Sequence, residues 1–195
     1  MTALAGTGQL VRLILRRDRF VLVAWIAVIV LVGVGTVSYY LQLFATPEAR
    51  AAFAVDVAAT PALLAFNGPL LADSLDVMAT WRMRDLSYTL IAVMTLMTVV
   101  RHSRAEEESG RQELVGAAAI GRHAALTAAT VVSACAAAVA ALLVAAGMVG
   151  LGLDPVGALG YALAATATGA VFTGVGAVVA QVAGSGRGAL GAGMS

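Results

Sequence analysis

Two long stretches of this chain, residues 86–100 and 124–149, contain no Asp, Glu, Lys, Arg or His and flank a densely charged segment at residues 103–115. Residues 20–41 and 156–182 have the same apolar character. In a bilayer the backbone must satisfy its own hydrogen bonds, so stretches of this kind predict membrane-spanning helices. The sequence therefore predicts an all-α fold, a polytopic transmembrane helical bundle with about four spans.

The composition supports this prediction, because 61% of the residues are hydrophobic and only 12% are charged. A soluble domain of this length would need a charged outer surface that the chain lacks. The span at residues 86–100 is short, about 22 Å against a hydrocarbon core of about 30 Å. We expect it to extend backward through Trp81 or to lean on partner helices. An amphipathic surface helix is the alternative.

The arginines are distributed unevenly about these four spans. Three lie in residues 42–85, whereas nine lie in residues 1–19, 101–123 and 183–195. The positive-inside rule makes the arginine-rich side cytoplasmic, with both ends of this chain there. The three are Arg50, Arg82 and Arg84; the nine are Arg12, Arg16, Arg17, Arg19, Arg101, Arg104, Arg111, Arg122 and Arg187.

The segments between the spans have predicted structures of their own. Residues 1–19 read as an interfacial elbow helix, with Arg12 and Arg16 on one face and Val11 and Ile14 on the other. A cleavable signal peptide is the rival interpretation, but the following run of about 22 apolar residues exceeds the roughly 7–15 of a signal peptide. In the outward segment 42–85, short helices are expected at 48–57 and 70–83, with breaks at residues 60–61 and 67–69. Whether this segment only packs on the spans or contacts a substrate stays open.

The charged segment allows i,i+4 pairs between Arg104 and Glu108 and between Glu107 and Arg111. Each exposed pair of this kind stabilises a helix by only about 0.2–0.5 kcal/mol. Stability therefore does not explain three consecutive glutamates. A solvated loop between two spans is the simpler interpretation if composition alone is considered.

Read as a string, residues 101–115 are RHSRAEEESGRQELV, followed by Ile120-Gly121-Arg122. This string resembles the coupling segment of ABC-2 type exporter permeases, and more closely that of actinobacterial permeases regarded as exporters of polyketide antibiotics. Two departures are Arg111, where many relatives carry Thr, and the absence of proline between Pro69 and Pro155. Permeases of that subfamily are longer, so the chain resembles their N-terminal portion, with residues 183–195 as a cytoplasmic linker to further spans.

The resemblance implies the transmembrane permease subunit of an ATP-driven exporter in the plasma membrane, moving amphipathic, antibiotic-like compounds outward. It implies a cytoplasmic ABC ATPase subunit, as a homodimer, that carries the ATP and Mg²⁺. The chain itself would be no enzyme and hold no cofactor; without a single lysine it cannot form a Walker-type phosphate loop. The residues expected to couple the ATPase to the spans are Glu106, Glu107, Glu108, Arg111 and Glu113.

Other interpretations remain open. The nearer one is a related permease for lipid or polysaccharide export, and the more distant one is a membrane anchor without transport. A net charge of +1 argues against nucleic acid as a partner. The expected partners are thus the ATPase, the bilayer, the remaining spans and a small-molecule substrate.

Two smaller features complete the predictions. His102 and Glu106 have metal-ligand spacing, but a zinc site needs three or four protein ligands, so we expect no metal and a solvated His102 beside the lipid headgroups. The stripe Ala165, Gly169, Thr173 and Ala177 predicts close helix packing by the last span.

Overall fold

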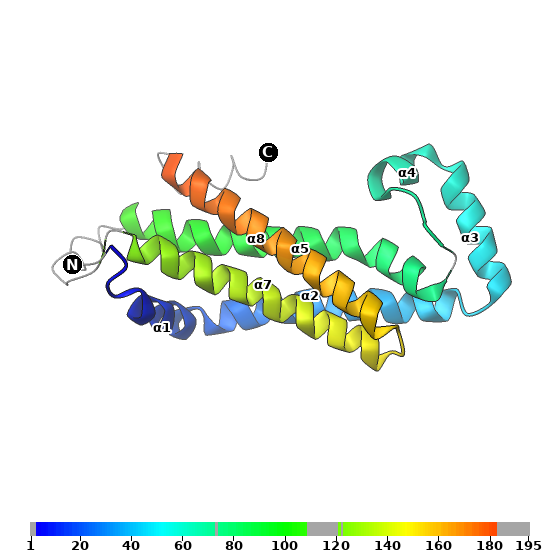
Figure 1. The fold of residues 1–195 in the computed structure, drawn as a ribbon, viewed down its shortest axis with the longest axis horizontal. Coiled ribbons are helices and arrows are strands. Elements are labelled where there is room, and N and C mark those ends of the chain that lie inside the picture. The colour runs from blue at the N-terminus through cyan, green and yellow to red at the C-terminus, as the bar shows by residue number, and fades with distance from the viewer. Residues whose placement is uncertain (1–2, 73, 109–120, 122, 183–195) are drawn as a thin grey trace.

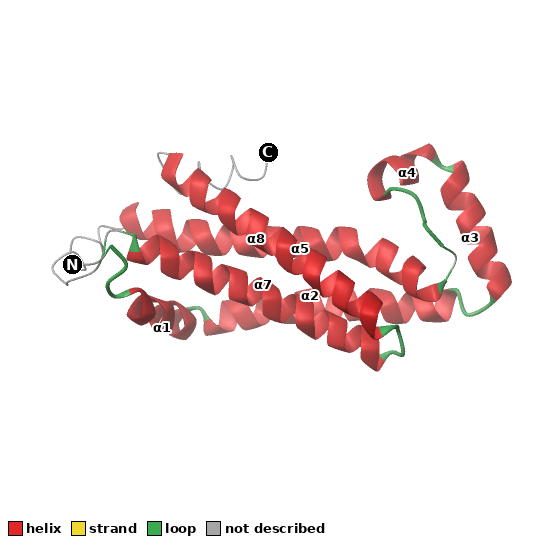
Figure 2. Cartoon of the chain, viewed as in Figure 1, coloured by secondary structure: helices red, strands yellow, loops and turns green. Residues whose placement is uncertain are grey.

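The computed structural model describes residues 3–72, 74–108, 121 and 123–182. Over these residues the chain is helical and has no β-strand, so the all-α prediction is confirmed (Figures 1 and 2). The helices are α1 (Thr7–Arg17), α2 (Arg19–Leu43), α3 (Pro47–Ala59), α4 (Pro61–Asn67), α5 (Leu75–Glu108), α7 (Ala124–Gly150) and α8 (Pro155–Val182).

Four long helices, α2, α5, α7 and α8, run side by side with alternating direction and form the body of the molecule (Figure 1). Each is long and apolar enough to cross a membrane. The stretch 86–100 lies within α5, in which the candidate span Leu75–Ser103 has 29 residues, includes Trp81 and carries charged residues near both of its ends. At about 1.5 Å per residue this candidate span exceeds the hydrocarbon thickness, in agreement with the expected extension backward through Trp81. It is also the most buried of the four, unlike an amphipathic surface helix.

Small residues let the long helices approach closely. A Cβ at Gly169 of α8 would lie only 2.4 Å from the Ala137 Cβ of α7, and one at Gly147 of α7 would lie 2.4 Å from a Val34 methyl of α2. Ala165, Gly169 and Thr173 are buried and Ala177 is half-buried, which confirms the packing stripe on the last span. Van der Waals contact between such surfaces is a main source of helix association in a bilayer.

A hydroxyl network links three helices inside the bundle. Ser133 Oγ of α7 donates to the Thr95 carbonyl of α5 at 3.1 Å and lies 3.1 Å from Thr173 Oγ1 of α8. Thr98 Oγ1 donates to the Met94 carbonyl of its own helix. These bonds satisfy hydroxyls that lack water in the bundle interior.

The helices α3 and α4 form a separate unit at one end of the bundle, opposite α1 (Figure 1). They meet at the Thr60-Pro61 break with a bend of 92°. The predicted helix at 48–57 is confirmed as α3, but the predicted short helix at 70–83 is wrong. The second short helix is α4, because Pro61 starts it and Gly68, at φ 70°, ends it, and residues from Leu75 onward belong to α5.

Aromatic side chains fasten this unit to the bundle. Phe53 of α3 lies 4.8 Å from Phe44 and 6.1 Å from Trp81 between ring centroids. Trp81 Nε1 donates to the Gly68 carbonyl at 3.1 Å, and Arg84 donates to the Asn67 carbonyl. The start of α5 therefore contacts α3 through an aromatic pair and the end of α4 through hydrogen bonds.

Candidate functional site

Asp18 lies at the joint between α1 and α2, where it ends one helix and begins the next. Its N–H donates to the Ile14 carbonyl at 2.8 Å, and its carbonyl accepts from the Leu22 N–H at 2.8 Å. An aspartate before a helix usually turns its carboxylate onto the first N–H groups of that helix, but Asp18 makes no such bond. Its carboxylate points across to another helix.

That carboxylate meets two consecutive residues of α5. Asp18 Oδ2 lies 2.6 Å from His102 Nε2, and Asp18 Oδ1 lies 3.3 Å from an Arg101 guanidinium nitrogen. The Asp18 and His102 side chains are 5% and 1% exposed, whereas Arg101 is half-exposed. An ionised carboxylate only accepts, so with Asp18 ionised the proton in the short contact belongs to Nε2.

The expectation of a solvated His102 is wrong, because the imidazole is buried against α1 and α2. No role was predicted for Asp18 from the sequence, and its partner His102 lies 84 residues away along the chain. The one local signal was an aspartate between two helix-forming stretches, which predicts an N-cap and not a contact with α5.

A second connection lies at the other flank of the charged segment. The Gly121 N–H donates to the Ala5 carbonyl at 2.9 Å, and the His123 N–H donates to the Ala3 carbonyl at 3.2 Å. The residues just before α7 are thus bound to those just before α1. Together with the Asp18–His102 contact, these bonds attach the two flanks of the charged segment to the two ends of α1.

The predicted coupling residues lie between these two attachments along the chain. Glu106, Glu107 and Glu108 end helix α5, about one turn after His102, and their side chains lie outside the described part of the structure. Arg111 and Glu113 lie outside the described residues altogether. The structure therefore shows how both flanks of the charged segment are attached to α1. The coupling role of these five residues stays a prediction.

These contacts connect the end of α5 mechanically to the joint between α1 and α2. A buried, short contact between a carboxylate and an imidazole resists separation, since parting them would break a hydrogen bond that water cannot readily replace. In the described part of the chain no group of three or more His, Cys, Asp or Glu side chains could hold a metal ion. A force on the last turn of α5 would reach the α1–α2 joint through Asp18.

At the opposite end of the bundle, α2, α4 and α5 enclose an open groove of about 1000 Å³. Its walls combine apolar and aromatic side chains, such as Leu31, Tyr39 and Phe66, with the charged groups of Arg82 and Asp85. A surface of this mixed character fits a ligand that has both apolar and polar parts.

The fold and these two regions define the class of the protein: a polytopic helical membrane protein with four helices able to cross a bilayer and a charged connection between the second and third. Comparison with known proteins adds a relative. The chain is 39% identical over 186 residues to the multidrug efflux system permease protein Rv1217c of Mycobacterium tuberculosis. The match covers 93% of this chain but 33% of the relative, so the chain spans about a third of that protein's length. No protein-family model matches the chain.

Proposed function

We propose that this chain forms part of the membrane permease of an ATP-driven efflux system, of the ABC-2 type. The observation that carries the proposal is its 39% identity, over nearly its whole length, to a multidrug efflux system permease. The charged segment at residues 103–115 supports it, because a dense charged connection between two spans offers a water-side surface for a partner. The ATPase is a separate subunit, a homodimer, that holds the ATP and Mg²⁺.

In this proposal the ATPase docks on the segment 101–123, and Glu106, Glu107, Glu108, Arg111 and Glu113 form the contact. Movement of the ATPase tilts the end of α5. Asp18 passes that movement to α1 and α2, while the backbone bonds of Gly121 and His123 pass it to the start of α1. The two attachments make α1 and the charged segment move together.

In the orientation that we propose, α1 and the charged segment lie on the cytoplasmic side of the membrane, and α3 and α4 lie outside the cell. Two sequence features support it: nine of the twelve arginines lie on the proposed inner side, and the outer segment 42–85 carries more acidic than basic residues. The outer groove would then open away from the cytoplasm.

We assign amphipathic, antibiotic-like compounds as the exported class. The mixed lining of the outer groove supports this assignment, because Tyr39 and Phe66 offer aromatic contact while Arg82 and Asp85 offer charge. A lipid or polysaccharide cargo is the nearest alternative. Competition for transport between a drug-like amphiphile and an unlabelled lipid would separate these classes.

Co-purification from membranes in mild detergent tests the proposal. A P-loop ATPase should accompany the wild-type protein and be lost when Glu106, Glu107 and Glu108 are all changed to Arg, because the contact becomes repulsive. The matched control reverses two exposed outer carboxylates, Glu48→Arg and Asp56→Arg, and should keep the ATPase. If no P-loop ATPase co-purifies with the wild-type protein, that result would favour the interpretation of the chain as a membrane anchor without transport.

A further inference from the structure

An apolar groove of about 360 Å³ lies where α1, α2 and α7 meet. Val11 and Leu15 of α1 form one wall, Leu22 and Ile26 of α2 another, and α7 closes it with residues between Val131 and Val139. Cys135, the only cysteine of the chain, lines the groove and is exposed. No charged side chain lies along its length except Arg19, at the α1–α2 joint.

The dimensions of the groove fit one leaflet of a bilayer. Along α2 it runs from Arg19 to Ile26, about 10 Å, and along α7 from Val131 to Val139, about 12 Å. Half of a hydrocarbon core is about 15 Å. If the joint lies at the level of the lipid headgroups, the groove covers most of the depth of that leaflet.

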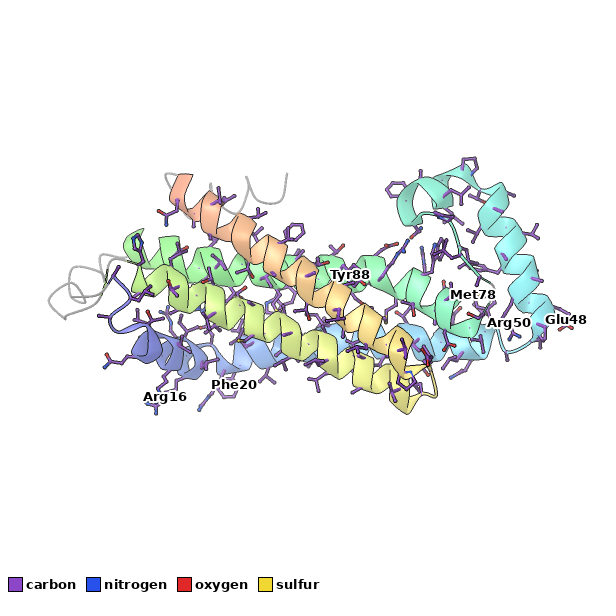
Figure 3. All side chains as sticks on the ribbon, in the orientation of Figure 1. Arg16, Phe20, Glu48, Arg50, Met78 and Tyr88 are labelled. Carbon is purple, nitrogen blue, oxygen red and sulfur yellow. The ribbon has the colours of Figure 1, made fainter. Side chains whose placement is uncertain are left out.

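The mouth of the groove is strongly basic. Arg12 and Arg16 lie exposed on α1, and the Arg19 guanidinium lies 4.6 Å from the centre of the Phe20 ring. Helix α1 carries no acidic residue, and the carboxylate of Asp18 is turned inward to α5. Arg16 and Phe20 project outward from the same side of this joint (Figure 3).

We propose that this groove binds an anionic phospholipid, with one acyl chain between α1, α2 and α7 and the phosphate at Arg19. Apolar lining over most of the depth of a leaflet suits the acyl chain, and the exposed guanidinium groups of Arg12, Arg16 and Arg19 at its mouth suit a net negative headgroup. The same arginines disfavour the choline cation of a zwitterionic lipid. The bound lipid would hold α1 against the membrane surface, beside the joint at Asp18.

Native mass spectrometry of the purified protein tests the proposal, with equimolar phosphatidylglycerol and phosphatidylcholine carrying identical acyl chains. The wild type should retain phosphatidylglycerol in preference. Arg19→Gln removes the charge at the mouth of the groove and should lower the preference for phosphatidylglycerol about fivefold. Arg50→Gln, at the opposite end of the bundle, should leave this preference unchanged. Cys135→Trp fills the groove and should lower the number of retained lipids by one, whereas Leu163→Trp, at an exposed position of α8 that does not line the groove, should leave it unchanged.

Three results would overturn the proposal. Equal retention of both lipids by the wild type would mean that only ordinary boundary lipid is present. A phosphatidylglycerol preference that survives Cys135→Trp would mean that headgroups gather at the arginines without a chain in the groove. A dimer that carries no lipid, and that Cys135→Trp dissociates, would identify a second copy of the protein as the occupant.

Discussion

Asp18 forgoes the local bond that an aspartate at a helix start ordinarily makes, and contacts His102 of α5 instead. A carboxylate that is 5% exposed would be costly to hold without partners, and the imidazole and the Arg101 guanidinium offset that cost. Because Arg101 is half-exposed, solvent weakens its share, and the contact with His102 dominates. The joint between α1 and α2 is therefore fixed to α5 by one short, buried contact.

Asp18→Ala should lower the free energy of unfolding by about 1–3 kcal/mol, because it removes one partner of a buried hydrogen bond. The matched control is Asp85→Ala, which breaks the partly exposed ion pair with Arg84 at 3.5 Å and should cost only about 0–1 kcal/mol. Thermal unfolding of both variants in the same detergent measures the difference. Equal losses would mean that the Asp18–His102 contact adds nothing beyond an ordinary surface pair.

The Asp18–His102 contact is the feature that the sequence predicted least well. The contact joins residues 84 positions apart, and neither shows a spacing or motif that marks it. His102 looked solvated because it stands beside the charged segment, but its orientation depends on how α5 packs against the α1–α2 joint. Local pattern does not contain that information.

The helices were predicted more accurately than the long-range contact, because each helix depends mainly on its own local sequence. Runs of apolar residues predicted the four long helices because the backbone of such a run must bond internally in a bilayer. The error at residues 70–83 arose from reading Pro61 and Gly68 only as breaks, whereas together they start and end α4. The apolar face of α1 was predicted correctly, since Ile14 is buried and Leu10 and Val11 pack against the core.

Gly169→Ala tests the close approach of α8 to α7. The added Cβ would lie 2.4 Å from the Ala137 Cβ, which cannot rotate away, so the helices must separate, at a cost of about 1–3 kcal/mol. Gly174→Ala on the same helix is the control, because its added Cβ meets no atom within 4 Å. The unfolding temperature of Gly169→Ala should lie well below that of the wild type, whereas that of Gly174→Ala should be close to it. The same unfolding temperature for both would contradict the packing described here.

Phe53→Ala tests how the unit formed by α3 and α4 is held against the long helices. Loss of the ring removes contacts with Phe44 and Trp81, so α3 should detach while the long helices keep their packing. Limited proteolysis should then cut faster within residues 45–74, with little change in the unfolding of the bundle. Phe66→Ala, which removes a ring that is 89% exposed, should leave the cleavage rate unchanged. Equal cleavage in both variants would mean that the aromatic contacts do not hold α3 in place.

For the whole molecule, the arrangement separates two ends with different properties. Helix α1 lies at one end, and α3 and α4 lie at the other (Figures 1 and 2). The first end holds the buried Asp18–His102 contact, and the second holds the groove between α2, α4 and α5. The exposed faces of α2 and α8 are apolar, with Phe20, Leu31 and Leu163 each more than half exposed. Such faces suit contact with lipid or with further spans.

The presence of four long apolar helices was predictable from the sequence, because hydrophobicity indicates which stretches can enter a bilayer. The link between the charged segment and α1 was not predictable from the sequence, because it depends on backbone hydrogen bonds from Gly121 and His123 and on one long-range side-chain contact. The roles of Glu106, Glu107, Glu108, Arg111 and Glu113 stay a prediction.

The measurement that tests the central claim most directly is ATP-dependent efflux of a fluorescent amphiphile from cells expressing the protein together with its ATPase. We expect the Glu106→Arg, Glu107→Arg, Glu108→Arg triple variant to lose efflux at normal expression, and the Glu48→Arg, Asp56→Arg control to retain it. Efflux that continues unchanged in the triple variant would contradict the proposal that the charged segment couples the spans to ATP hydrolysis.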